Sequence, residues 1–397
     1  MRFQAESDVS VSERQREAPE LATSARSNLL PRRDYFLLPL LSVLTVAVML
    51  AAAEMATRLI WTRGGSDGCV AGDSVAGPRR LPNCTFRRKE PESPWITYSY
   101  NNCGYRTLES CGPKPNGTVR IALLGASISE GYLIPYQQTF STETAEMLTR
   151  ACHKPVEFQN MGVAACSPTY ASRRMDDALA LHPDAVVYAL NAYDIEHDRD
   201  PYPPTEKTGP ASSQRTNADG TATQLISNLR RIASESRALL VAQHFLFQDP
   251  QFYVELYSRQ GDHAGYLRSS FPPAWEAYFA DFELRLRSMA QKAHAAHVPL
   301  IVLPIPERSQ AALFGLKNPP AGLDAFAFER KISQIASAED VNFVDVFTDF
   351  SREPHPEKMF YVVDTHLSPG GNVVITRALT RELLKTPIPA LSGCGVR

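Results

Sequence analysis

The sequence has no excess of charge of either sign and no strongly hydrophobic character overall. Lysine and arginine number 41 against 43 aspartate and glutamate, so the formal net charge is −2. A nucleic-acid-binding surface requires a basic excess, and this balance therefore argues against nucleic acid as a partner. The mean hydropathy of −0.24 excludes a protein with many membrane spans but is compatible with a single apolar segment.

The chain also lacks an internal repeat and the composition of a disordered, collagen-like or coiled-coil protein. Hydrophobic residues make up 44% and charged residues 21% of the 397 residues. This proportion is sufficient for a sizeable hydrophobic core. The length predicts two or three domains, or one large domain with extensions.

One long hydrophobic run is present near the N-terminus. Residues 35–53 carry no charge, and the first charged residue after them is Glu54. About 20 apolar residues suffice for a helix to cross a bilayer. A signal peptide is the alternative, but the run begins deep in the chain and is longer than the usual apolar region of such a peptide. We therefore expect an uncleaved transmembrane anchor over residues 35–61, preceded by a disordered cytoplasmic tail over residues 1–34.

The arginines that flank this run predict its orientation. Four arginines precede it and two follow it closely: Arg16, Arg26, Arg32, Arg33, Arg58 and Arg63. The bias places the N-terminus in the cytoplasm and the rest of the chain outside, in the periplasm or the extracellular space.

The cysteines agree with an oxidising location, because all seven lie beyond the apolar run. They are Cys69, Cys84, Cys103, Cys111, Cys152, Cys166 and Cys394. Close neighbours among them are candidates for disulfides, although the sequence does not fix the connectivity. We expect a bond between Cys103 and Cys111 and an unpaired Cys394. Cys152 and Cys166 fit a disulfide and two buried thiols equally well.

Beyond the apolar run, glycine, proline and charge clusters predict a linker over residues 62–98, followed by one domain over residues 99–390. Short apolar runs then alternate with amphipathic segments. Strands are predicted at 119–124, 155–160, 184–191, 298–306 and 341–347, and helices at 137–150, 171–181, 273–296, 326–338 and 369–384. The alternation predicts an α/β fold with a parallel five-stranded sheet and helices on both faces, interrupted by an insertion at about 197–272.

A serine directly follows the first predicted strand, in Gly125-Ala126-Ser127-Ile128-Ser129-Glu130-Gly131. At a strand-to-helix junction, the hydroxyl of Ser127 would lie at the sheet edge and its N–H at a helix start. This position suits a nucleophile whose own N–H can stabilise an oxyanion. An ordinary helix-capping serine is the alternative.

An aspartate and a histidine lie close together near the C-terminus, in Asp364-Thr365-His366-Leu367-Ser368-Pro369. The carboxylate of Asp364 can orient the imidazole of His366 through one ring nitrogen. The other nitrogen is then free to deprotonate a serine hydroxyl.

Together these motifs resemble those of the SGNH hydrolase superfamily, also called GDSL-type esterases, over about residues 99–385. The resemblance implies a flavodoxin-like three-layer α/β/α sandwich with Ser127 as nucleophile and Asp364 and His366 as acid and base. Gly162, in Asn160-Met161-Gly162-Val163, matches the second-block glycine whose N–H is an oxyanion donor. The stretch Asn101-Asn102-Cys103-Gly104-Tyr105-Arg106 is similar to the N-x-x-G-[FY]-R lead-in of membrane-anchored members.

The sequence departs from the family pattern in two places. Ala126 replaces the aspartate of G-D-S, which is not the nucleophile. The third block, normally G-x-N-D, reads Asn191-Ala192-Tyr193-Asp194, so Tyr193 stands where the family has asparagine. We expect Asn191 rather than Tyr193 to supply the side-chain donor of the oxyanion hole, because the tyrosine ring would crowd a pocket built for an amide.

The resemblance implies a serine esterase or deacylase that acts on an ester or O-acyl substrate through an acyl-enzyme, and the apolar run and its flanking arginines predict that it is membrane-anchored and extracytoplasmic. It implies no metal and no organic cofactor. The Asp-x-His spacing also occurs in relatives that O-acetylate cell-surface polysaccharides, so an O-acetyltransferase is one alternative. The altered third block leaves a second alternative, a catalytically degenerate domain that binds a glycan or an envelope partner.

Three further segments have open interpretations. The acidic stretch over residues 194–200 fits a solvated loop better than a cation site, because no metal-ligand spacing recurs elsewhere. The aromatic segment 244–261 predicts either a lid or substrate wall, or packing onto the main domain. The pair Glu307-Arg308 either borders the pocket or forms an ion pair on the surface.

Overall fold

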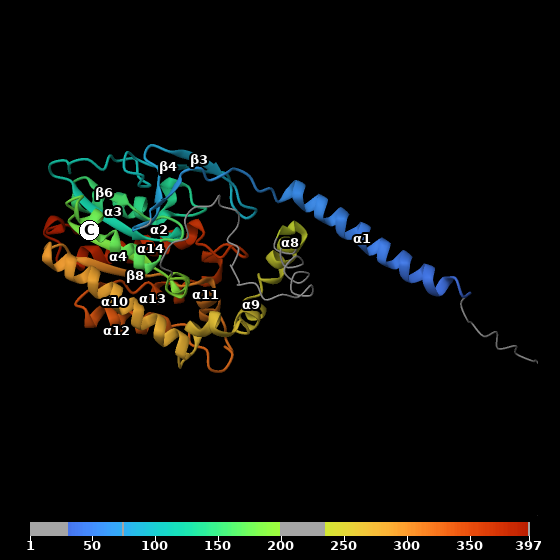
Figure 1. The fold of residues 1–397 in the computed structure, drawn as a ribbon. Helices are drawn as coiled ribbons and strands as arrows, with labels where there is room; N and C mark the ends of the chain where they lie inside the picture. The colour runs from blue at the N-terminus through green and yellow to red at the C-terminus, as the bar shows by residue number, and fades with distance from the viewer. Residues whose placement is uncertain (1–30, 74, 199–234, 396–397) are drawn as a thin grey trace, which may run out of the picture. The chain divides into compact units, whose positions relative to one another are not determined.

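The structure is a computed structural model that describes residues 31–73, 75–198 and 235–395. The chain divides into two units, with the boundary between Ala52 and Ala53. Helix α1 (Asp34–Ile60) is the one described helix that is long and apolar enough to cross a membrane (blue in Figure 1). We expected a disordered tail over residues 1–34, and residues 1–30 of this segment lie outside the described residues.

The second unit is built on a parallel sheet of five strands, as the sequence predicted (Figure 1). The strands are β5 (Val119–Gly125), β6 (Val156–Asn160), β7 (Ala185–Leu190), β8 (Leu300–Pro304) and β9 (Asn342–Phe343), in the spatial order β6-β5-β7-β8-β9. The chain adds β6 on one side of β5 and then returns to place β7 on the other side. Open α/β sheets bind ligands at the carboxyl ends of the strands at such a reversal.

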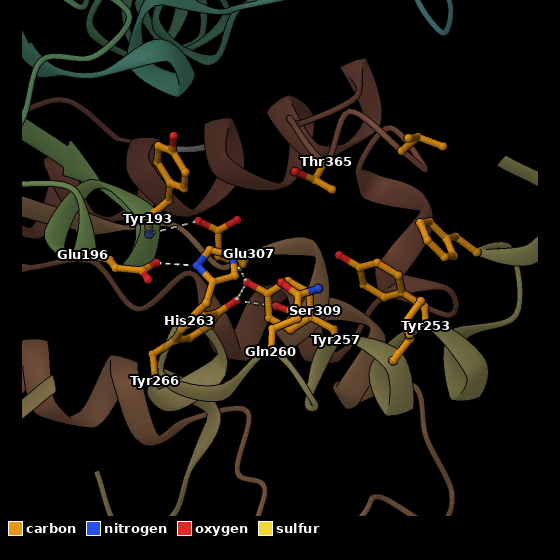
Figure 2. A pocket seen from close by; sticks show the side chains of 13 residues that line it. Tyr193, Glu196, Tyr253, Tyr257, Gln260, His263, Tyr266, Glu307, Ser309 and Thr365 are labelled. Carbon is orange, nitrogen blue, oxygen red and sulfur yellow. Dashed lines mark hydrogen bonds and ion pairs between the residues drawn. The ribbon is translucent and has the colours of Figure 1, made fainter. Parts of the chain in front are cut away.

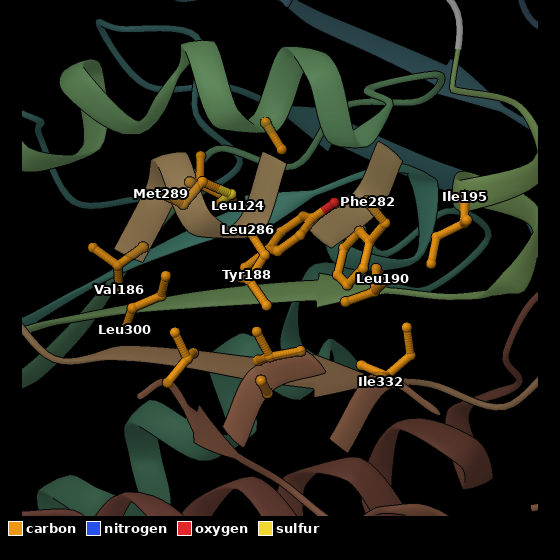
Figure 3. Close-up of a cluster of buried hydrophobic side chains, with 14 of the residues drawn as sticks. Leu124, Val186, Tyr188, Leu190, Ile195, Phe282, Leu286, Met289, Leu300 and Ile332 are labelled. Carbon is orange, nitrogen blue, oxygen red and sulfur yellow. The ribbon is translucent and has the colours of Figure 1, made fainter. Parts of the chain in front are cut away.

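Helices cover both faces of this sheet because successive strand side chains point to opposite sides. Leu124 and Tyr188 contribute to one core, and Leu123 and Val187 to the other. The first core, shown in Figure 3, is covered by α4 (Pro168–Arg173), α5 (Met175–Leu179), α6 (Ala192–Glu196), α10 (Pro273–Ala295) and α12 (Ala327–Ala338). The second core is covered by α3 (Phe140–Cys152), α13 (Phe347–Ser351) and α14 (Pro369–Lys385). The predicted three-layer sandwich is confirmed.

The last strand is much shorter than the run over 341–347 predicted. Strand β9 ends at Phe343, and the chain turns almost at once into α13. Asp345 directs this turn, since its Oδ1 accepts the N–H of Thr348 at 2.9 Å. Val344 and Val346 are nevertheless buried in the second core, and the N–H of Val344 still donates to the carbonyl of Val302 on β8 at 3.0 Å.

The segment over 62–98 is more ordered than the linker we expected. It contains two antiparallel hairpins, one of β1 (Val70–Asp73) with β2 (Gly77–Arg80) and one of β3 (Thr85–Arg88) with β4 (Ile96–Ser99). The Cys69–Cys84 disulfide links the two hairpins. The segment therefore belongs to the folded unit that carries the sheet.

A buried ion pair joins these hairpins to the helix that follows β5. Glu130 lies in α2 (Ser127–Glu130) and is fully buried. Arg80 donates from Nε to Oε1 of Glu130 at 2.6 Å and from Nη2 to Oε2 at 3.0 Å. The Tyr100 hydroxyl donates to Oε1 at 2.6 Å, and the Ala164 N–H donates to Oε2 at 3.1 Å. One carboxylate thus receives donors from three separate segments.

The lead-in motif holds the chain that leaves α2. The guanidinium of Arg106 is buried and donates to the carbonyls of Glu130, Gly131 and Ile134 at 2.7, 2.6 and 2.7 Å. Gly104 allows the close approach of the motif to the first hairpin. Its φ is +80°, and a Cβ there would lie 2.1 Å from the carbonyl oxygen of Arg80, so a side chain cannot be accommodated.

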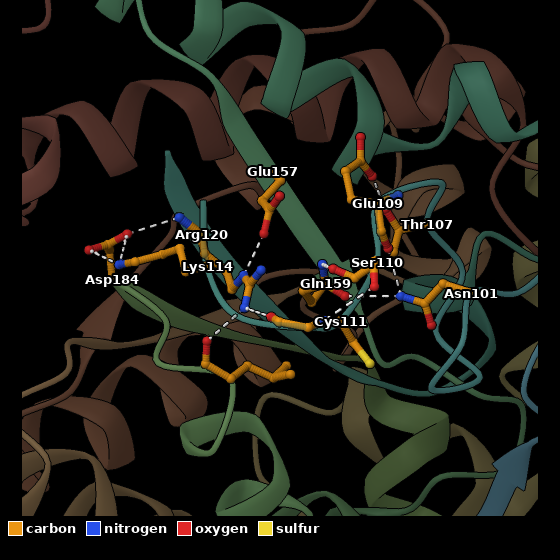
Figure 4. Close-up of polar contacts among 12 residues, drawn as sticks. Asn101, Thr107, Glu109, Ser110, Cys111, Lys114, Arg120, Glu157, Gln159 and Asp184 are labelled. Atoms are coloured by element: carbon orange, nitrogen blue, oxygen red, sulfur yellow. Dashed lines mark hydrogen bonds and ion pairs between the residues drawn. The ribbon is translucent and has the colours of Figure 1, made fainter. Parts of the chain in front are cut away.

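A second polar network fastens the opposite, amino-terminal edge of the sheet (Figure 4). Arg120 at the start of β5 pairs with Glu157 on β6 and donates to the carbonyls of Gly112 and Leu181 at 2.9 and 3.0 Å. Asp184 accepts the N–H of Arg120 at 2.9 Å and also binds Lys114. These contacts hold the segment before β5 at the amino-terminal edge of the sheet, opposite the carboxyl ends of the strands.

The structure contains three disulfides: Cys69–Cys84, Cys103–Cys111 and Cys152–Cys394. The prediction for Cys103–Cys111 is confirmed. The expectation that Cys394 is unpaired is wrong, because the chain after α14 returns beside α3 and brings Cys394 to Cys152 with a Cα–Cα distance of 4.4 Å. Cys166 is instead the free cysteine, buried in the first core.

We expect Glu130→Ala to lower the free energy of unfolding by about 3–5 kcal/mol, because it removes the acceptors of Nε and Nη2 of the buried Arg80 and leaves Asp67 as the carboxylate that pairs with this guanidinium. Asp177→Ala is the matched control. It removes a carboxylate that binds the half-exposed Arg79 at 2.8 Å, and a pair of this kind contributes less than about 1 kcal/mol. Urea unfolding of the full chain in detergent measures both. Equal losses for the two variants would contradict the assignment.

Candidate active site

The three residues predicted for catalysis lie together at the carboxyl end of the sheet. Ser127 begins α2 immediately after β5. Its Oγ lies 2.8 Å from Nε2 of His366, and Nδ1 of His366 lies 2.7 Å from Oδ1 of Asp364. This continuous hydrogen-bonded chain has the geometry needed to activate a serine hydroxyl.

Asp364 and His366 occupy a tight loop just before α14. The loop is closed by hydrogen bonds from the N–H of Tyr361 to the carbonyl of His366 at 2.8 Å and from the N–H of Thr365 to the carbonyl of Tyr361 at 3.2 Å. Thr365, between the two catalytic side chains, has φ +68°. This left-handed conformation is uncommon for a β-branched residue and costs energy, as is typical of functional loops.

A glutamate from the region of the N-terminal hairpins binds this loop. Oε2 of Glu92 accepts the N–H groups of Val363 and Asp364, both at 2.9 Å. Its Oε1 lies 2.6 Å from Nδ1 of His244, on α8 (Arg237–Leu246). Glu92 could not be recognised from the sequence, because it lies 272 positions before Asp364 in a segment that has the composition of a linker.

The surroundings of His366 make it a stronger base than an ordinary histidine. Burial would lower its pKa, but the charge of Asp364 and the hydrogen bond to it outweigh burial, so the pKa is raised. For Asp364, burial would raise the pKa, but the interactions with His366 dominate and keep it below its usual value. Each residue thus stabilises the charged form of the other.

Asn191 lies beside the nucleophile because of the strand register. Gly125 of β5 pairs with Ala189 of β7, so Ser127 and Asn191 each lie two residues beyond a paired position on neighbouring strands. Oδ1 of Asn191 accepts the N–H of Asp194 at 2.9 Å, and Asp194 accepts the N–H of Asn191 at 3.1 Å. This reciprocal capping leaves the amide Nδ2 as the donor group of Asn191. Burial raises the pKa of Asp194 to about 8, although the Asn191 N–H opposes this rise.

Tyr193 is placed differently from Asn191. Its side chain is 53% exposed and its ring stacks on His197 with the centroids 3.9 Å apart. Its backbone N–H donates to Oε1 of Glu307 at 3.3 Å. Tyr193 therefore borders the site from the solvent side.

Gly162 does not have the surroundings that we expected of an oxyanion donor. Its N–H donates to Oδ1 of Asn160 at 3.0 Å, and a Cβ there would lie 2.5 Å from the backbone nitrogen of Glu130. The residue is thus needed for close packing against α2. Ala165, with φ +64°, lines the cavity beside Ser127 instead. A left-handed alanine has no sequence signature, so this position could not be recognised beforehand.

The triad opens into a cavity of about 620 Å³. Tyr132 and Arg88 form part of its wall. The Tyr132 ring lies 4.6 Å from the His366 ring, and the Arg88 guanidinium lies 5.1 Å from the centre of the Tyr132 ring. Across the described parts of the chain, no group of three His, Cys, Asp or Glu side chains is arranged to hold a metal ion.

The first part of the acidic stretch, residues 194–196, belongs to helix α6 rather than to the solvated loop we expected, and carboxylates of the stretch bind neighbouring groups. Glu196 lies 2.6 Å from Nδ1 of His263, and Asp198 accepts the N–H and the hydroxyl of Thr169, each at 3.0 Å. Asp200 lies outside the described residues. Of the pair at the end of β8, Glu307 lines the catalytic cavity and Arg308 is buried, so the two are not a surface ion pair.

Comparison with known families is consistent with this geometry. The model of the GDSL-like lipase/acylhydrolase family matches residues 123–374, which is more than half of the chain. The chain belongs to this family. The match includes all three residues of the triad and excludes the hairpins, the lead-in motif and Glu92.

The chain is also similar to solved structures of esterases and acylhydrolases at low sequence identity. The lipase/acylhydrolase of Enterococcus faecalis is 13% identical, with 67% of this chain and 95% of that chain covered and a TM-score of 0.37. A variant of an acetylxylan esterase from Geobacillus stearothermophilus is 15% identical, with 67% and 94% covered and a TM-score of 0.36. An esterase of Pseudoalteromonas is 13% identical, with 67% and 97% covered and a TM-score of 0.36. No curated protein matches, and we infer no substrate from these structures.

We expect Glu92→Ala to lower kcat for a simple ester by about 10- to 100-fold with little change in KM, because a catalytic group displaced by about 1 Å loses that much rate. His244→Gln is the control, since it preserves both backbone hydrogen bonds of Glu92. Steady-state kinetics with 4-nitrophenyl acetate measure both. A change in KM alone for Glu92→Ala would show that the residue does not position the triad.

Proposed function

We propose that this protein is a membrane-anchored serine esterase or deacylase whose catalytic domain lies outside the cytoplasm and acts on an ester or O-acyl substrate. The observation that carries the proposal is the hydrogen-bonded chain from Asp364 through His366 to Ser127 at the mouth of a cavity. Membership of a lipase/acylhydrolase family agrees with it.

The reaction follows from the positions of these three side chains. Nε2 of His366 takes the proton of Ser127 Oγ as the oxygen attacks the ester carbonyl, and Asp364 stabilises the imidazolium that forms. His366 then gives this proton to the oxygen of the departing alcohol, which leaves the acyl group on Ser127. A water molecule, deprotonated by His366, attacks the acyl carbon and releases the acid.

The oxyanion that forms during each attack requires hydrogen-bond donors. We assign the N–H of Ser127 at the start of α2 and Nδ2 of Asn191 to this role. The N–H of Ala165 replaces that of Gly162 as the second backbone donor. Ala165 lines the cavity with Ser127, and no partner for its N–H is found among the described residues, whereas Gly162 donates to Asn160.

The location outside the cytoplasm rests on two features. Helix α1 is long and apolar enough to span a membrane, and more arginines lie close before the apolar run than close after it. The three disulfides all lie beyond α1, and such bonds persist in oxidising compartments.

A fluorophosphonate probe tests the proposal, because it reacts with an activated serine whatever the natural substrate. We expect the full-length protein to be labelled at Ser127 and the Ser127→Ala variant to remain unlabelled. The labelling rate should fall as the pH is lowered, with a midpoint above 6.5, because His366 acts only when neutral and its pKa is raised. An unlabelled wild-type protein would instead favour a domain that binds without turnover.

The oxyanion hole can be tested by two substitutions. Asn191→Ala should lower kcat by about 10²–10³, the typical loss for one oxyanion donor. Tyr193→Phe should have a small effect, because the Tyr193 ring lies toward solvent. Circular dichroism of both variants controls for folding. A severe loss in Tyr193→Phe with normal activity in Asn191→Ala would reverse the assignment.

The topology can be tested with a reporter. We expect alkaline phosphatase fused after residue 70 to be active, because this enzyme requires an oxidising compartment to form its disulfides. The mature protein should keep its N-terminus. Recovery of a soluble form that begins near Glu54 would show that the apolar run is a signal peptide.

A further inference from the structure

A second cavity, of about 280 Å³, adjoins the catalytic one (Figure 2). Tyr193, Glu307 and Thr365 line both cavities. The second cavity is formed largely by α9 (Pro250–Tyr257) and η2 (Gly261–Leu267), which belong to the insertion, together with the start of α11 (Arg308–Phe314). Its volume is near the lower end of the range for ligand pockets, about 300–1,000 Å³, so it suits one small ring.

The walls of this second cavity are mainly aromatic. Phe247, Tyr253 and Tyr257 line one side, with neighbouring ring centroids 5.4 and 5.9 Å apart. Tyr253 also packs in a small hydrophobic core with α11. The aromatic segment of the insertion therefore both packs onto the domain and forms a wall of the second cavity. Aromatic faces of this kind bind the apolar face of a ring-shaped ligand.

A chain of hydrogen bonds also lines the second cavity, and Tyr257 belongs both to this chain and to the aromatic wall (Figure 2). Glu196 Oε2 lies 2.6 Å from Nδ1 of His263, and Nε2 of His263 lies 3.2 Å from the Tyr257 hydroxyl. The chain continues through the hydroxyls of Tyr266 and Ser309, at 2.9 and 2.5 Å. All five side chains of this chain line the cavity, and each is hydrogen-bonded to its neighbour in the chain.

This chain can present either a donor or an acceptor to a ligand. A hydroxyl group both donates and accepts, and the chain contains the three hydroxyls of Tyr257, Tyr266 and Ser309. A ligand hydroxyl, which also donates and accepts, is therefore matched in either direction. An ammonium group requires acceptors alone and would use only part of the chain.

The charges around the second cavity also disfavour a cation. The Arg308 guanidinium lies 4.0 Å from the centre of the Tyr253 ring and so already occupies one face of that aromatic wall. The hydrogen bond with Glu196 raises the pKa of His263, which favours an ion pair without net charge. Burial raises the pKa of Glu307, so this carboxyl is less readily ionised than an exposed one.

The position of the second cavity identifies the part of the substrate that it would hold. Thr365 lies between Asp364 and His366, so the cavity adjoins the triad on the side of the base. In ester cleavage the base delivers its proton to the oxygen of the departing alcohol. The alcohol portion of the ester must therefore lie on this side.

We propose that the second cavity is the subsite for the alcohol portion of the substrate and that it binds a single neutral polyhydroxylated ring, a monosaccharide unit. The ring packs on Tyr253 and Tyr257, and its hydroxyls bind the chain from Glu196 to Ser309. This proposal rests on the esterase function proposed above, since it assigns the alcohol of that reaction.

The test compares two acetyl esters with the full-length protein in detergent. We expect kcat/KM for methyl 6-O-acetylglucopyranoside to exceed that for ethyl acetate at least tenfold. Tyr257→Phe, which interrupts the hydrogen-bonded chain, should reduce this ratio about five- to tenfold. Tyr278→Phe is the matched control, because Tyr278 lines neither cavity, and it should keep the wild-type ratio.

A second variant fills the cavity without disturbing the core. Leu256 lines the cavity and its side chain is 43% exposed, so Leu256→Trp should fold and should raise KM for the sugar ester at least tenfold. NMR line broadening of methyl glucopyranoside measures binding without turnover. We expect broadening with the wild-type protein and its loss with Leu256→Trp.

The outcomes separate this proposal from the proposed function. Labelling of Ser127 without any sugar preference or line broadening would overturn the subsite and leave the esterase intact. A preference for acetylcholine that Tyr257→Phe abolishes would overturn it in favour of a cation site. If Ser127 is not labelled, broadening that Leu256→Trp removes would still support a sugar site, and its absence would overturn that site as well.

Discussion

The burial of one carboxylate, that of Glu130, is the constraint on which the arrangement of the active site depends. Its two oxygens accept hydrogen bonds from Arg80 in the hairpins, from the Tyr100 hydroxyl just after β4, and from the N–H of Ala164 in the loop after β6. Because Glu130 lies three residues after Ser127 in the same short helix, each of these contacts also fixes the nucleophile. A buried charge with several donors tolerates little displacement, which gives this helix of one turn a defined orientation.

The sheet order supplies the second constraint. Neighbouring strands β5 and β7 end at the same level, and each is followed by a polar residue, Ser127 and Asn191. The base comes from a loop that no strand positions. Instead, Glu92 holds that loop through two backbone N–H groups, and the closed turn from Tyr361 to His366 determines where the imidazole lies. Both sides of the site are thus supported by residues outside the family match, the nucleophile helix by Arg80 and the histidine loop by Glu92.

The sequence predicted the features that depend on local pattern. The buried strands, the serine at a strand end, the Asp-x-His loop and the Cys103–Cys111 bond are all encoded within short stretches, and the structure contains each of them. Features that depend on distant contacts were missed or wrong. Cys394 meets Cys152 only because two helices pack together across 242 positions, and the surroundings of Gly162 depend on the backbone of α2. The hairpins could not be predicted, because their short strands are rich in glycine and charge and show no alternation of hydrophobic and polar residues.

The compact unit that carries the sheet extends beyond the residues that the family model matches. The family match begins at residue 123, whereas Arg80, Glu92 and Arg106 all precede it. A fragment that begins at the start of the match would keep Ser127, Asp364 and His366. It would lose the contacts of Arg80 and Tyr100 with the buried Glu130 carboxylate and the hydrogen bonds of Glu92 with the histidine loop. The residues between α1 and β5 therefore stabilise the positions of the catalytic side chains from outside the family match. Substitutions in this segment, which lies outside the family match, would therefore alter the position of the catalytic side chains without changing any of them.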